Sequence, residues 1–292
     1  MAFVLNPRPS APRVELIARS GTRRLGDLVR QPVLLFSWII VLLAIGWAVA
    51  PSLFTSHSPY AGDPDASFAA PSLDHWFGTD RLGRDLFARS VYGAGTTLTA
   101  TLLAVLIAFG LGTLVGLTAG FVRGVVDTVI MRVVDVFLAI PSLLLAMVIV
   151  SVLGYSTNNI ALAVGISSIA AFARVMRAEV LSVVSRDYVR AAYGLGVSRI
   201  GVVLKHVVPN SLTSVVALAA LEVGTAILAV AGLGFLGYGA PPPEPEWGLL
   251  VAEGRDFVAS APWTSLMPGA ALALVVLSTH RISVSLRKDH AR

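Results

Sequence analysis

The stretch TTLTATLLAVLIAFGLGTLVGLTAGFV, residues 96–122, has no charged side chain over 27 consecutive positions. An α-helix needs about 20 consecutive apolar residues to cross the hydrocarbon core of a bilayer. This stretch is therefore long enough to span a membrane. It decides the fold class, because the rest of the chain must then be placed relative to a bilayer.

The composition of the whole chain agrees with a membrane protein. The 292 residues are 55% hydrophobic and 13% charged, with a mean hydropathy of +0.78, whereas a soluble domain contains about 25% charged residues. This excludes an ordinary soluble enzyme. The absence of cysteine excludes disulfides, iron–sulfur sites and a catalytic thiol. The five histidines form no close-spaced ligand cluster along the sequence, so no metal site is predicted.

Five further apolar runs complete the predicted fold. They cover residues 33–54, 133–153, 159–173, 212–237 and 263–278. With 96–122 they predict an all-α, polytopic integral membrane protein with six transmembrane helices. Pro141 predicts a kink in the third span, and the fourth span is short unless its helix continues past Arg174 as a protruding stalk.

The first span has two interpretations. Residues 48–50, Ala-Val-Ala, mimic the cleavage site of a signal peptide, but Pro51 directly after them should block processing, and five more spans follow. We therefore expect the first span to be retained as a membrane anchor.

The basic residues predict which side of the membrane each connection faces, because cytoplasmic loops retain positive charge. Of the 22 lysines and arginines, 18 lie in residues 1–32, 122–132, 174–210 and 281–292. Both termini are therefore predicted to be cytoplasmic. The sequence pI near 10.0 reflects this topology rather than nucleic-acid binding, for which no basic surface domain remains.

This topology divides the chain into three parts. Residues 1–32 form a basic cytoplasmic tail. Residues 33–95 form the first span and a large outer loop. Residues 96–292 form a five-helix core that ends in a short cytoplasmic C-terminus.

The longest inner connection, about 174–210, is expected to form two short helices around a turn. In the second helix, Ile200, Val203/Leu204 and Val207 form an apolar stripe at helical spacing, and Pro209-Asn210 stops the run. A cytosolic amphipathic helix followed by a re-entering span is suited to docking in the groove of a partner protein.

This connection resembles a known motif. The run Arg190-Ala191-Ala192-x3-Gly196, followed after nine residues by HVVP (206–209), resembles the EAA loop of binding-protein-dependent ABC importer permeases, whose consensus is Glu-Ala-Ala-x3-Gly-x9-Ile-x-Leu-Pro. Three further segments resemble the dipeptide/oligopeptide/nickel branch, in particular the subunit with the large first outer loop. They are HWFGTDRLGRD (75–85), DTVIMRVVDVFLAIP (127–141) and GLGFLGYGAPPPEPEWG (232–248).

The resemblance implies a type I ABC importer permease fold with a cytoplasmic coupling helix, within a coupling loop of about 187–209 that sits in a cleft of a cytosolic ATPase. Ala191 and Ala192 would allow close approach, and Gly196 permits a turn with positive φ. The full set of coupling candidates is Tyr188, Arg190, Ala191, Ala192, Gly196, Arg199, Lys205, His206 and Pro209. Arg190 replaces the consensus Glu, and His206 replaces Ile. The alternative is a basic juxtamembrane helix that lies on anionic lipid.

The partners implied by the resemblance supply the energy and the substrate. They are a homologous second permease, two cytosolic ABC ATPases that bind ATP and Mg²⁺, and an extracytoplasmic solute-binding protein, in a bacterial cell membrane. The chain itself is expected to be no enzyme and to hold no cofactor, because neither Lys205 nor Lys288 lies in a P-loop. A dipeptide or oligopeptide is the expected cargo, with nickel chelates and glutathione as alternatives.

Three residues are candidates for the translocation pathway: Glu222, Phe235 and Pro141. Glu222 is a carboxylate well inside an apolar run, and charges within a membrane are functional hypotheses by default. It could line the route, pair with a partner span, or be a hydrogen-bonded group at a helix interface. In a rival class, a self-sufficient secondary transporter or channel, Glu222 would be the coupling carboxylate.

Other residues are expected to act in packing or at the outer surface. Gly112, Gly116 and Gly120 form a small-residue ridge that favours close helix packing. Arg132 and Asp135, three residues apart, are expected to pair structurally, with a gate contact as the alternative. In the acidic outer loop, the family-like run 72–92 is expected to dock the binding protein or cap a gate, and 55–71 to be passive.

Overall fold

The computed structural model describes residues 32–290, with side chains as far as residue 285. The predicted tail over 1–32 therefore lies outside the described residues, apart from Pro32. The described part consists of helices joined by turns and irregular loops. Within residues 32–290 its β-structure is limited to isolated bridges. Its helices are α2 (Pro32–Val49), α3 (Leu86–Val122), α4 (Gly124–Ala139), α5 (Ser142–Leu153), α6 (Thr157–Val184), α7 (Asp187–Gly194), α8 (Arg199–Val202), α9 (Val208–Phe235), α10 (Trp247–Gly254) and α11 (Trp263–His290).

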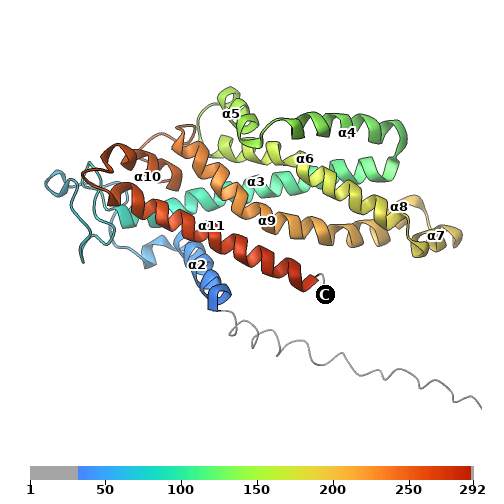
Figure 1. The fold of residues 1–292 in the computed structure, drawn as a ribbon, viewed down its shortest axis with the longest axis horizontal. Helices are drawn as coiled ribbons and strands as arrows, with labels where there is room; N and C mark the ends of the chain where they lie inside the picture. Colours follow the sequence, from blue (N-terminus) through green and yellow to red (C-terminus); the bar gives the residue numbers. More distant parts are fainter. Residues whose placement is uncertain (1–31, 291–292) are drawn as a thin grey trace, which may run out of the picture.

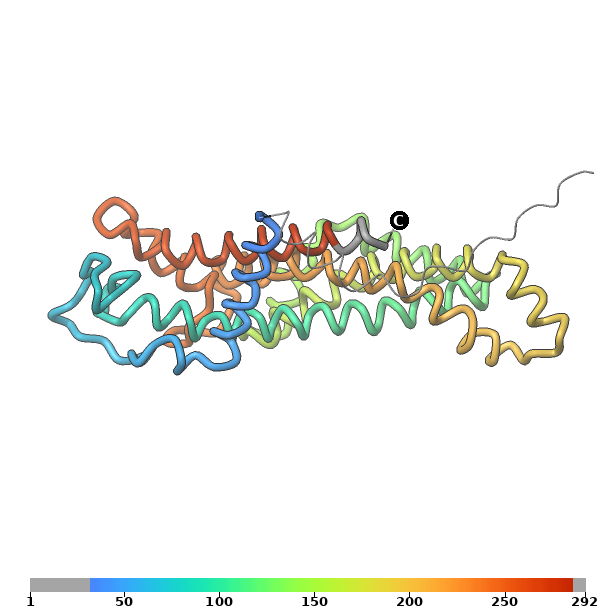
Figure 2. Tube along the Cα trace, turned by 90° about the horizontal axis from the view of Figure 1, so that it is seen from below, coloured from blue at the N-terminus to red at the C-terminus, as the bar shows by residue number. Residues whose placement is uncertain are grey.

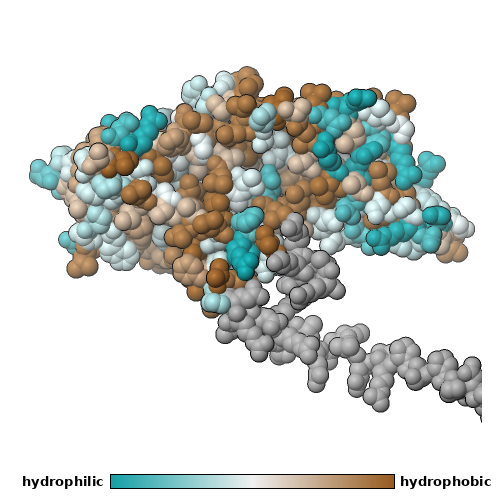
Figure 3. Space-filling model, in the orientation of Figure 1, coloured by the Kyte–Doolittle hydropathy of each residue, from teal (hydrophilic) through white to brown (hydrophobic). Residues whose placement is uncertain are grey.

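The helices form an elongated bundle with two polar ends. Figure 1 shows α3, α6, α9 and α11 running along the long axis, with α7 at one end and α10 at the other. In Figure 2 the outer-loop residues and α10 gather at one end, and the turn through α7 forms the opposite tip. Apolar side chains cover most of the middle of the face in Figure 3, and hydrophilic ones gather toward the ends. This distribution is that of a protein whose middle lies in a bilayer.

Five helices are long and apolar enough to span a membrane, and α4 with α5 supplies a sixth if the pair counts as one span. These five helices match five of the six predicted spans, and the predicted third span is a pair of helices with 95° between α4 and α5 rather than one kinked helix. Ile140 takes an extended conformation (φ −93°, ψ 130°) and Pro141 is the N-cap of α5. The residue before a proline is driven out of the helical region, and proline lacks the N–H that would continue α4.

Several spans are longer than the apolar runs that predict them, most clearly α3 and α6. Helix α3 begins at Leu86 instead of Thr96, because the Asp85 side chain accepts a hydrogen bond from the Ala88 N–H at 2.6 Å and so caps the helix. Its 37 residues correspond to about 55 Å, well beyond a bilayer core of about 30 Å. Helix α6 continues past Arg174 to Val184, which forms the stalk expected for the fourth span.

Pro209 does not end the second coupling helix, contrary to the sequence-based expectation. A π-helical segment, Val203–Val207, joins α8 to α9, and Pro209 lies in the first turn of α9. The wider π turn changes the hydrogen-bond register just before the residue that has no N–H to donate. The side chain of Asn210 donates to the carbonyl of His206 at 2.6 Å. The helix therefore runs continuously from Arg199 to Phe235.

The glycine ridge of α3 packs on α6, as expected for close helix packing. A Cβ atom added at Gly112 would lie 2.4 Å from the Phe172 Cβ, and one at Gly116 would lie 2.4 Å from the Ala173 carbonyl oxygen. At Gly120 it would meet Val180 at 2.9 Å. Successive glycines of α3 contact successively later residues of α6, so the two helices run parallel. The ridge lets the two backbones approach each other within this subunit.

We expect Gly116→Ala to destabilise the protein and Gly110→Ala to leave it unchanged or slightly stabilised. The methyl group at position 116 meets backbone, whereas a Cβ at Gly110 of the same helix has nothing within 4 Å. Overpacking costs about 1–3 kcal/mol, and each kcal/mol lowers Tm by roughly 2–4 °C in a chain of this size. Thermal unfolding in detergent measures the difference. Equal Tm values for the two variants would contradict the assignment of the ridge.

Candidate functional site

The coupling loop at the α7 end is held in place by its inward face. Val189 and Ala192 of α7 and Val202 and Val207 of the following turns lie in one buried cluster with Val180 of α6. This cluster joins the loop to the bundle by apolar contact. The loop is therefore built as a rigid continuation of α6 and α9.

The turn inside the coupling loop depends on a glycine and a helix cap. Gly196 has φ +82°, a left-handed conformation that L-residues with a side chain rarely adopt. Ser198 then caps α8, since its Oγ accepts a hydrogen bond from the Gly201 N–H at 3.1 Å. The sequence-based expectation of a turn with positive φ at Gly196 is confirmed.

The outward face of the coupling loop is apolar at its centre. The exposed fractions are 42% for Tyr188, 85% for Leu195, 73% for Ile200 and 64% for Leu204. The predicted stripe of Ile200, Val203/Leu204 and Val207 is wrong in part, because Val207 is buried while Ile200 and Leu204 are exposed. Leu204 and Val207 both lie in the π-helical segment Val203–Val207, whose wider turn departs from the α-helical spacing on which the predicted stripe depends.

The other coupling candidates lie around this apolar centre. Ala192 is buried and Ala191 is exposed, so only Ala191 is available to an external partner. The Tyr188 and His206 rings are 6.2 Å apart. Arg190 donates to the Ser185 carbonyl at 2.9 Å and is otherwise solvated, 3.7 Å from the exposed Asp187. The remaining exposed candidates are Gly196, Arg199, Lys205 and Pro209.

Two ion pairs connect helix α4, which the break before Pro141 separates from α5, to α6. Arg177 donates to Asp127 with Nε at 2.5 Å and with Nη2 at 2.7 Å. Arg174 donates to Asp135 at 2.7 Å. The predicted pairing of Asp135 with Arg132 is therefore wrong: the tertiary structure brings an arginine of α6 against Asp135.

Glu222 is a hydrogen-bonded group between α6 and α9. The Ser168 hydroxyl donates to Glu222 Oε1 at 2.8 Å, and both side chains are at least half-buried. No basic side chain of the described part forms an ion pair with it. This arrangement corresponds to the interface interpretation. The other pathway candidates lie elsewhere: Pro141 at the α4–α5 break, and Phe235 at the end of α9, with the Arg255 guanidinium 5.9 Å from its ring centroid.

The segment Glu246-Trp247-Gly248 inserts α10 into the other end of the bundle. Glu246 caps α10 by accepting from the N–H groups of Gly248 and Leu249, both at 2.9 Å, and its carboxylate also accepts from the Thr97 hydroxyl at 3.1 Å. The Trp247 ring is fully buried and donates to the Ser90 carbonyl at 2.8 Å. Burial raises the pKa of the Glu246 carboxyl, and these hydrogen bonds oppose the shift.

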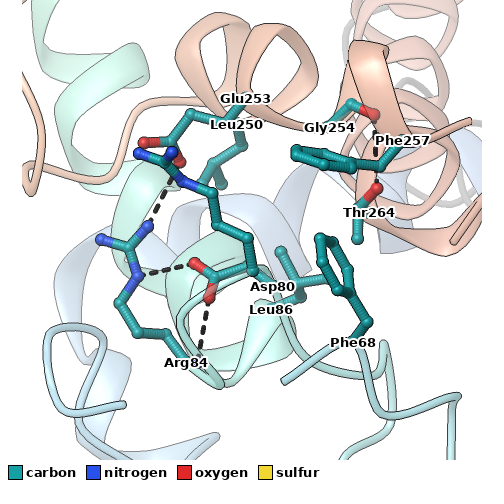
Figure 4. A pocket seen from close by; sticks show the side chains of 10 residues that line it. Phe68, Asp80, Arg84, Leu86, Leu250, Glu253, Gly254, Phe257 and Thr264 are labelled. Carbon is teal, nitrogen blue, oxygen red and sulfur yellow. Dashed lines mark hydrogen bonds and ion pairs between the residues drawn. The ribbon is translucent and has the colours of Figure 1, made fainter. Parts of the chain in front are cut away.

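A buried charge cluster of Asp80, Arg84, Arg89 and Glu253 ties the outer loop to α3 and α10. Arg84 Nε donates to Asp80 Oδ2 at 2.6 Å, and Arg89 Nη2 donates to Glu253 Oε2 at 2.9 Å. Figure 4 shows Arg84 lying between the carboxylates of Asp80 and Glu253. Arg89 is completely buried. No sequence pattern predicted this cluster beyond a charged family-like run, because Arg89 and Glu253 are 164 positions apart.

Two of the five histidines, which are not close-spaced along the sequence, meet in the tertiary structure. The tertiary structure brings His57 and His75 to the same carboxylate, that of Asp85. The two histidines are 18 positions apart in an irregular loop, which is why their spacing gave no sign of it.

Comparison with known proteins places this geometry in a family. Residues 112–289 match the family described as "Binding-protein-dependent transport system inner membrane component", which is more than half of the chain. The chain belongs to this family. Its resemblance to ABC importer permeases is thereby confirmed.

Several permeases are similar over most of their length. The dipeptide permease DppC of Alkalihalophilus pseudofirmus is 39% identical over 97% of this chain and 94% of its own. The probable D,D-dipeptide permease DdpC of Escherichia coli K12 is 37% identical over 98% of this chain and 96% of its own. The glutathione permease GsiD of E. coli O6:K15:H31 is 42% identical over 74% of this chain and 72% of its own.

Solved structures agree in fold. An amino acid ABC transporter aligns with a TM-score of 0.55 at 16% identity, covering 70% of this chain and 94% of that chain. The MetNI methionine ABC transporter aligns with a TM-score of 0.56 at 18% identity, covering 71% and 98%. The chain is thus a multi-pass permease subunit of the type I ABC importer fold, and its expected lack of enzymatic function agrees with this membership.

We expect Arg89→Met to destabilise the permease strongly. The substitution leaves Glu253 and Asp80 with Arg84 alone, and breaking one partner out of a buried pair costs about 3–5 kcal/mol. Arg255→Met is the matched control, because Arg255 pairs with Asp256 on an exposed surface, where an ion pair contributes about 0–1 kcal/mol. Thermal unfolding in detergent compares the two. A Tm for Arg89→Met equal to that of the control would show that the cluster does not hold the outer loop.

Proposed function

We propose that this permease is one of two homologous subunits that together form the translocation pathway of an importer for dipeptides or similarly small peptides. The observation that carries the proposal is the apolar outward face of the coupling loop, which is rigidly joined to two membrane helices and has no partner within the described chain. The names of the similar permeases support the cargo, since they specify dipeptide, D,D-dipeptide and glutathione.

The apolar centre of the coupling loop supports docking to a protein more strongly than lying on lipid. The turn through α7 forms a tip of the bundle (Figure 2), away from the apolar middle seen in Figure 3. Leu195, Ile200 and Leu204 are exposed. Basic and aromatic side chains surround them, which is the pattern of an interface with an apolar core and a polar rim. The expected partners are two cytosolic ATPases, which supply the ATP and Mg²⁺ sites.

In this proposal, movement of the ATPases is transmitted through the packing of the coupling loop. Val189 and Ala192 contact the stalk of α6, and Val202 and Val207 continue into α9. A push on the loop therefore acts on two long helices at once. These helices reach the opposite end of the bundle, where an extracytoplasmic binding protein would deliver substrate. Alternating access follows if the two ends open in turn.

The proposal includes an orientation. Both termini and the α7 end face the cytoplasm of a bacterial cell, and the outer loop and α10 face outward. The support is the concentration of 18 of the 22 basic residues in the four connections assigned to the inside.

We expect Leu195→Asp combined with Ile200→Asp to abolish coupling. Two carboxylates on the apolar face would have to be desolvated on docking, so recovery of the ATPases with the tagged permease from its host membranes should fall at least about tenfold, with peptide uptake falling in parallel. Val125→Asp is the matched control, because Val125 is 79% exposed near the same end but outside the loop. Mass spectrometry of the purified complex and uptake of a labelled dipeptide provide the measurements.

Two results would contradict the proposal. One is unchanged ATPase recovery and uptake in the double variant. The other is peptide transport by the purified permease alone in liposomes under an ion gradient, abolished by Glu222→Gln, which would instead support a secondary transporter.

A further inference from the structure

A three-residue cluster lies at the start of α3, apart from the coupling loop and the buried charge cluster. His75 Nδ1 lies 2.8 Å from Asp85 Oδ2, and His57 Nδ1 lies 3.5 Å from the same oxygen. One ligand atom from each residue lies within 4.8 Å of the other two. The proposed function of the permease makes no use of this group.

The carboxylate of Asp85 is oriented toward the two histidines by the helix it caps. Its Oδ1 accepts a hydrogen bond from the Ala88 N–H at 2.6 Å, which leaves Oδ2 directed at the imidazoles. Asp85 is 4% exposed, so its position is fixed by packing. A carboxylate that is held by one oxygen and free at the other can act as a preoriented ligand.

The two histidines are held by their own local turns. The His57 N–H donates to Thr55 Oγ1 at 3.1 Å, and the His75 N–H donates to Ser72 Oγ at 3.1 Å. Their rings are 5.4 Å apart, and the side chains are 46% and 27% exposed. An open hollow of about 280 Å³ adjoins the group, with Ser56, Asp74 and Trp76 in its lining. An ion could therefore reach the cluster from solvent.

We propose that His57, His75 and Asp85 bind a divalent transition metal ion of the zinc class. Ligand atoms about 2.0–2.2 Å from a tetrahedral zinc ion lie roughly 3.3 Å from one another, a value that falls between the two measured separations of 2.8 and 3.5 Å. Two imidazoles and one carboxylate suit zinc, cobalt and nickel, whereas magnesium and calcium prefer oxygen ligands alone. The fourth position faces the hollow and takes water.

The bound ion would join three segments of the outer surface. His57 follows the 3-10 turn after α2, His75 lies in the middle of the outer loop, and Asp85 begins α3. A metal bound to all three would restrain the loop that the proposed function places on the side of substrate delivery. Without metal, the hydrogen bond between His75 and Asp85 would hold only two of the segments together.

Zinc binding by the full-length permease tests the proposal directly. The chain is purified in detergent without a polyhistidine tag, freed of metal by chelation, and titrated with Zn²⁺ by calorimetry. We expect one ion per chain, a Tm that rises with Zn²⁺ but not with Mg²⁺, and visible absorption bands of tetrahedral coordination when Co²⁺ replaces Zn²⁺.

Variants separate this site from other sites and from simple loss of fold. His57→Gln and His75→Gln should each weaken Zn²⁺ binding at least about tenfold. Asp85→Asn should do the same while its amide oxygen still caps α3. His280→Gln is the matched control, since His280 is exposed on α11. Each variant is compared at equal elution volume in size-exclusion chromatography.

Two results of the binding measurements and one of thermal unfolding would overturn the proposal. One is the absence of saturable binding near one ion per chain. The other is wild-type affinity in both histidine variants, which would place the ion elsewhere. A Tm that falls in His75→Gln but never responds to metal would reduce the group to a hydrogen-bonded pair. Failure of these tests leaves the transport proposal intact, because transport is tested at the opposite end of the bundle.

Discussion

The close contact of α3 with α6 is the interaction on which the rest of the permease depends. The glycine ridge brings the two backbones together over most of the apolar middle, where only van der Waals contact and hydrogen bonding can hold helices in lipid. Because the helices run parallel, one extends to the outer loop through the Asp85 cap, and the other extends to the coupling loop through its stalk. The two functional ends of the molecule are therefore attached to one rigid axis.

Polar side chains next to the α3–α6 pair form specific hydrogen bonds and ion pairs with α6. Glu222 accepts a hydrogen bond from Ser168 across the α6–α9 interface, and Asp127 and Asp135 pair with arginines of α6. Each ties a neighbouring helix to α6. For Glu222 and Asp127 the pairing also avoids a buried or half-buried carboxylate without a partner, which would be costly, whereas the pair of Asp135 with Arg174 is exposed. Helix α4 depends on this most, because among its side chains only Val134 is buried. Its attachment by ion pairs suits an element whose apolar side chains are mostly exposed in the described chain.

Much of the fold followed from local patterns. Apolar runs without charge predicted the positions of five spans, Pro141 predicted a kink where the remaining one is broken, and the Gly196 spacing predicted the turn of the coupling loop. Boundaries were less accurate where a side chain or a register change intervened. The Asp85 cap lengthened α3 by ten residues, and the π-helical segment leaves Val207 buried while Ile200 and Leu204 are exposed.

The sequence by itself determined the fold class and the family, because hydrophobic length and motif spacing are local quantities. Only the tertiary structure decided which charges meet. Asp135 meets Arg174 instead of Arg132, Arg89 meets Glu253 from the far end of the chain, and His57 joins His75 on Asp85. Such pairs depend on how helices and loops are placed in three dimensions, and residue spacing along one chain does not encode that placement.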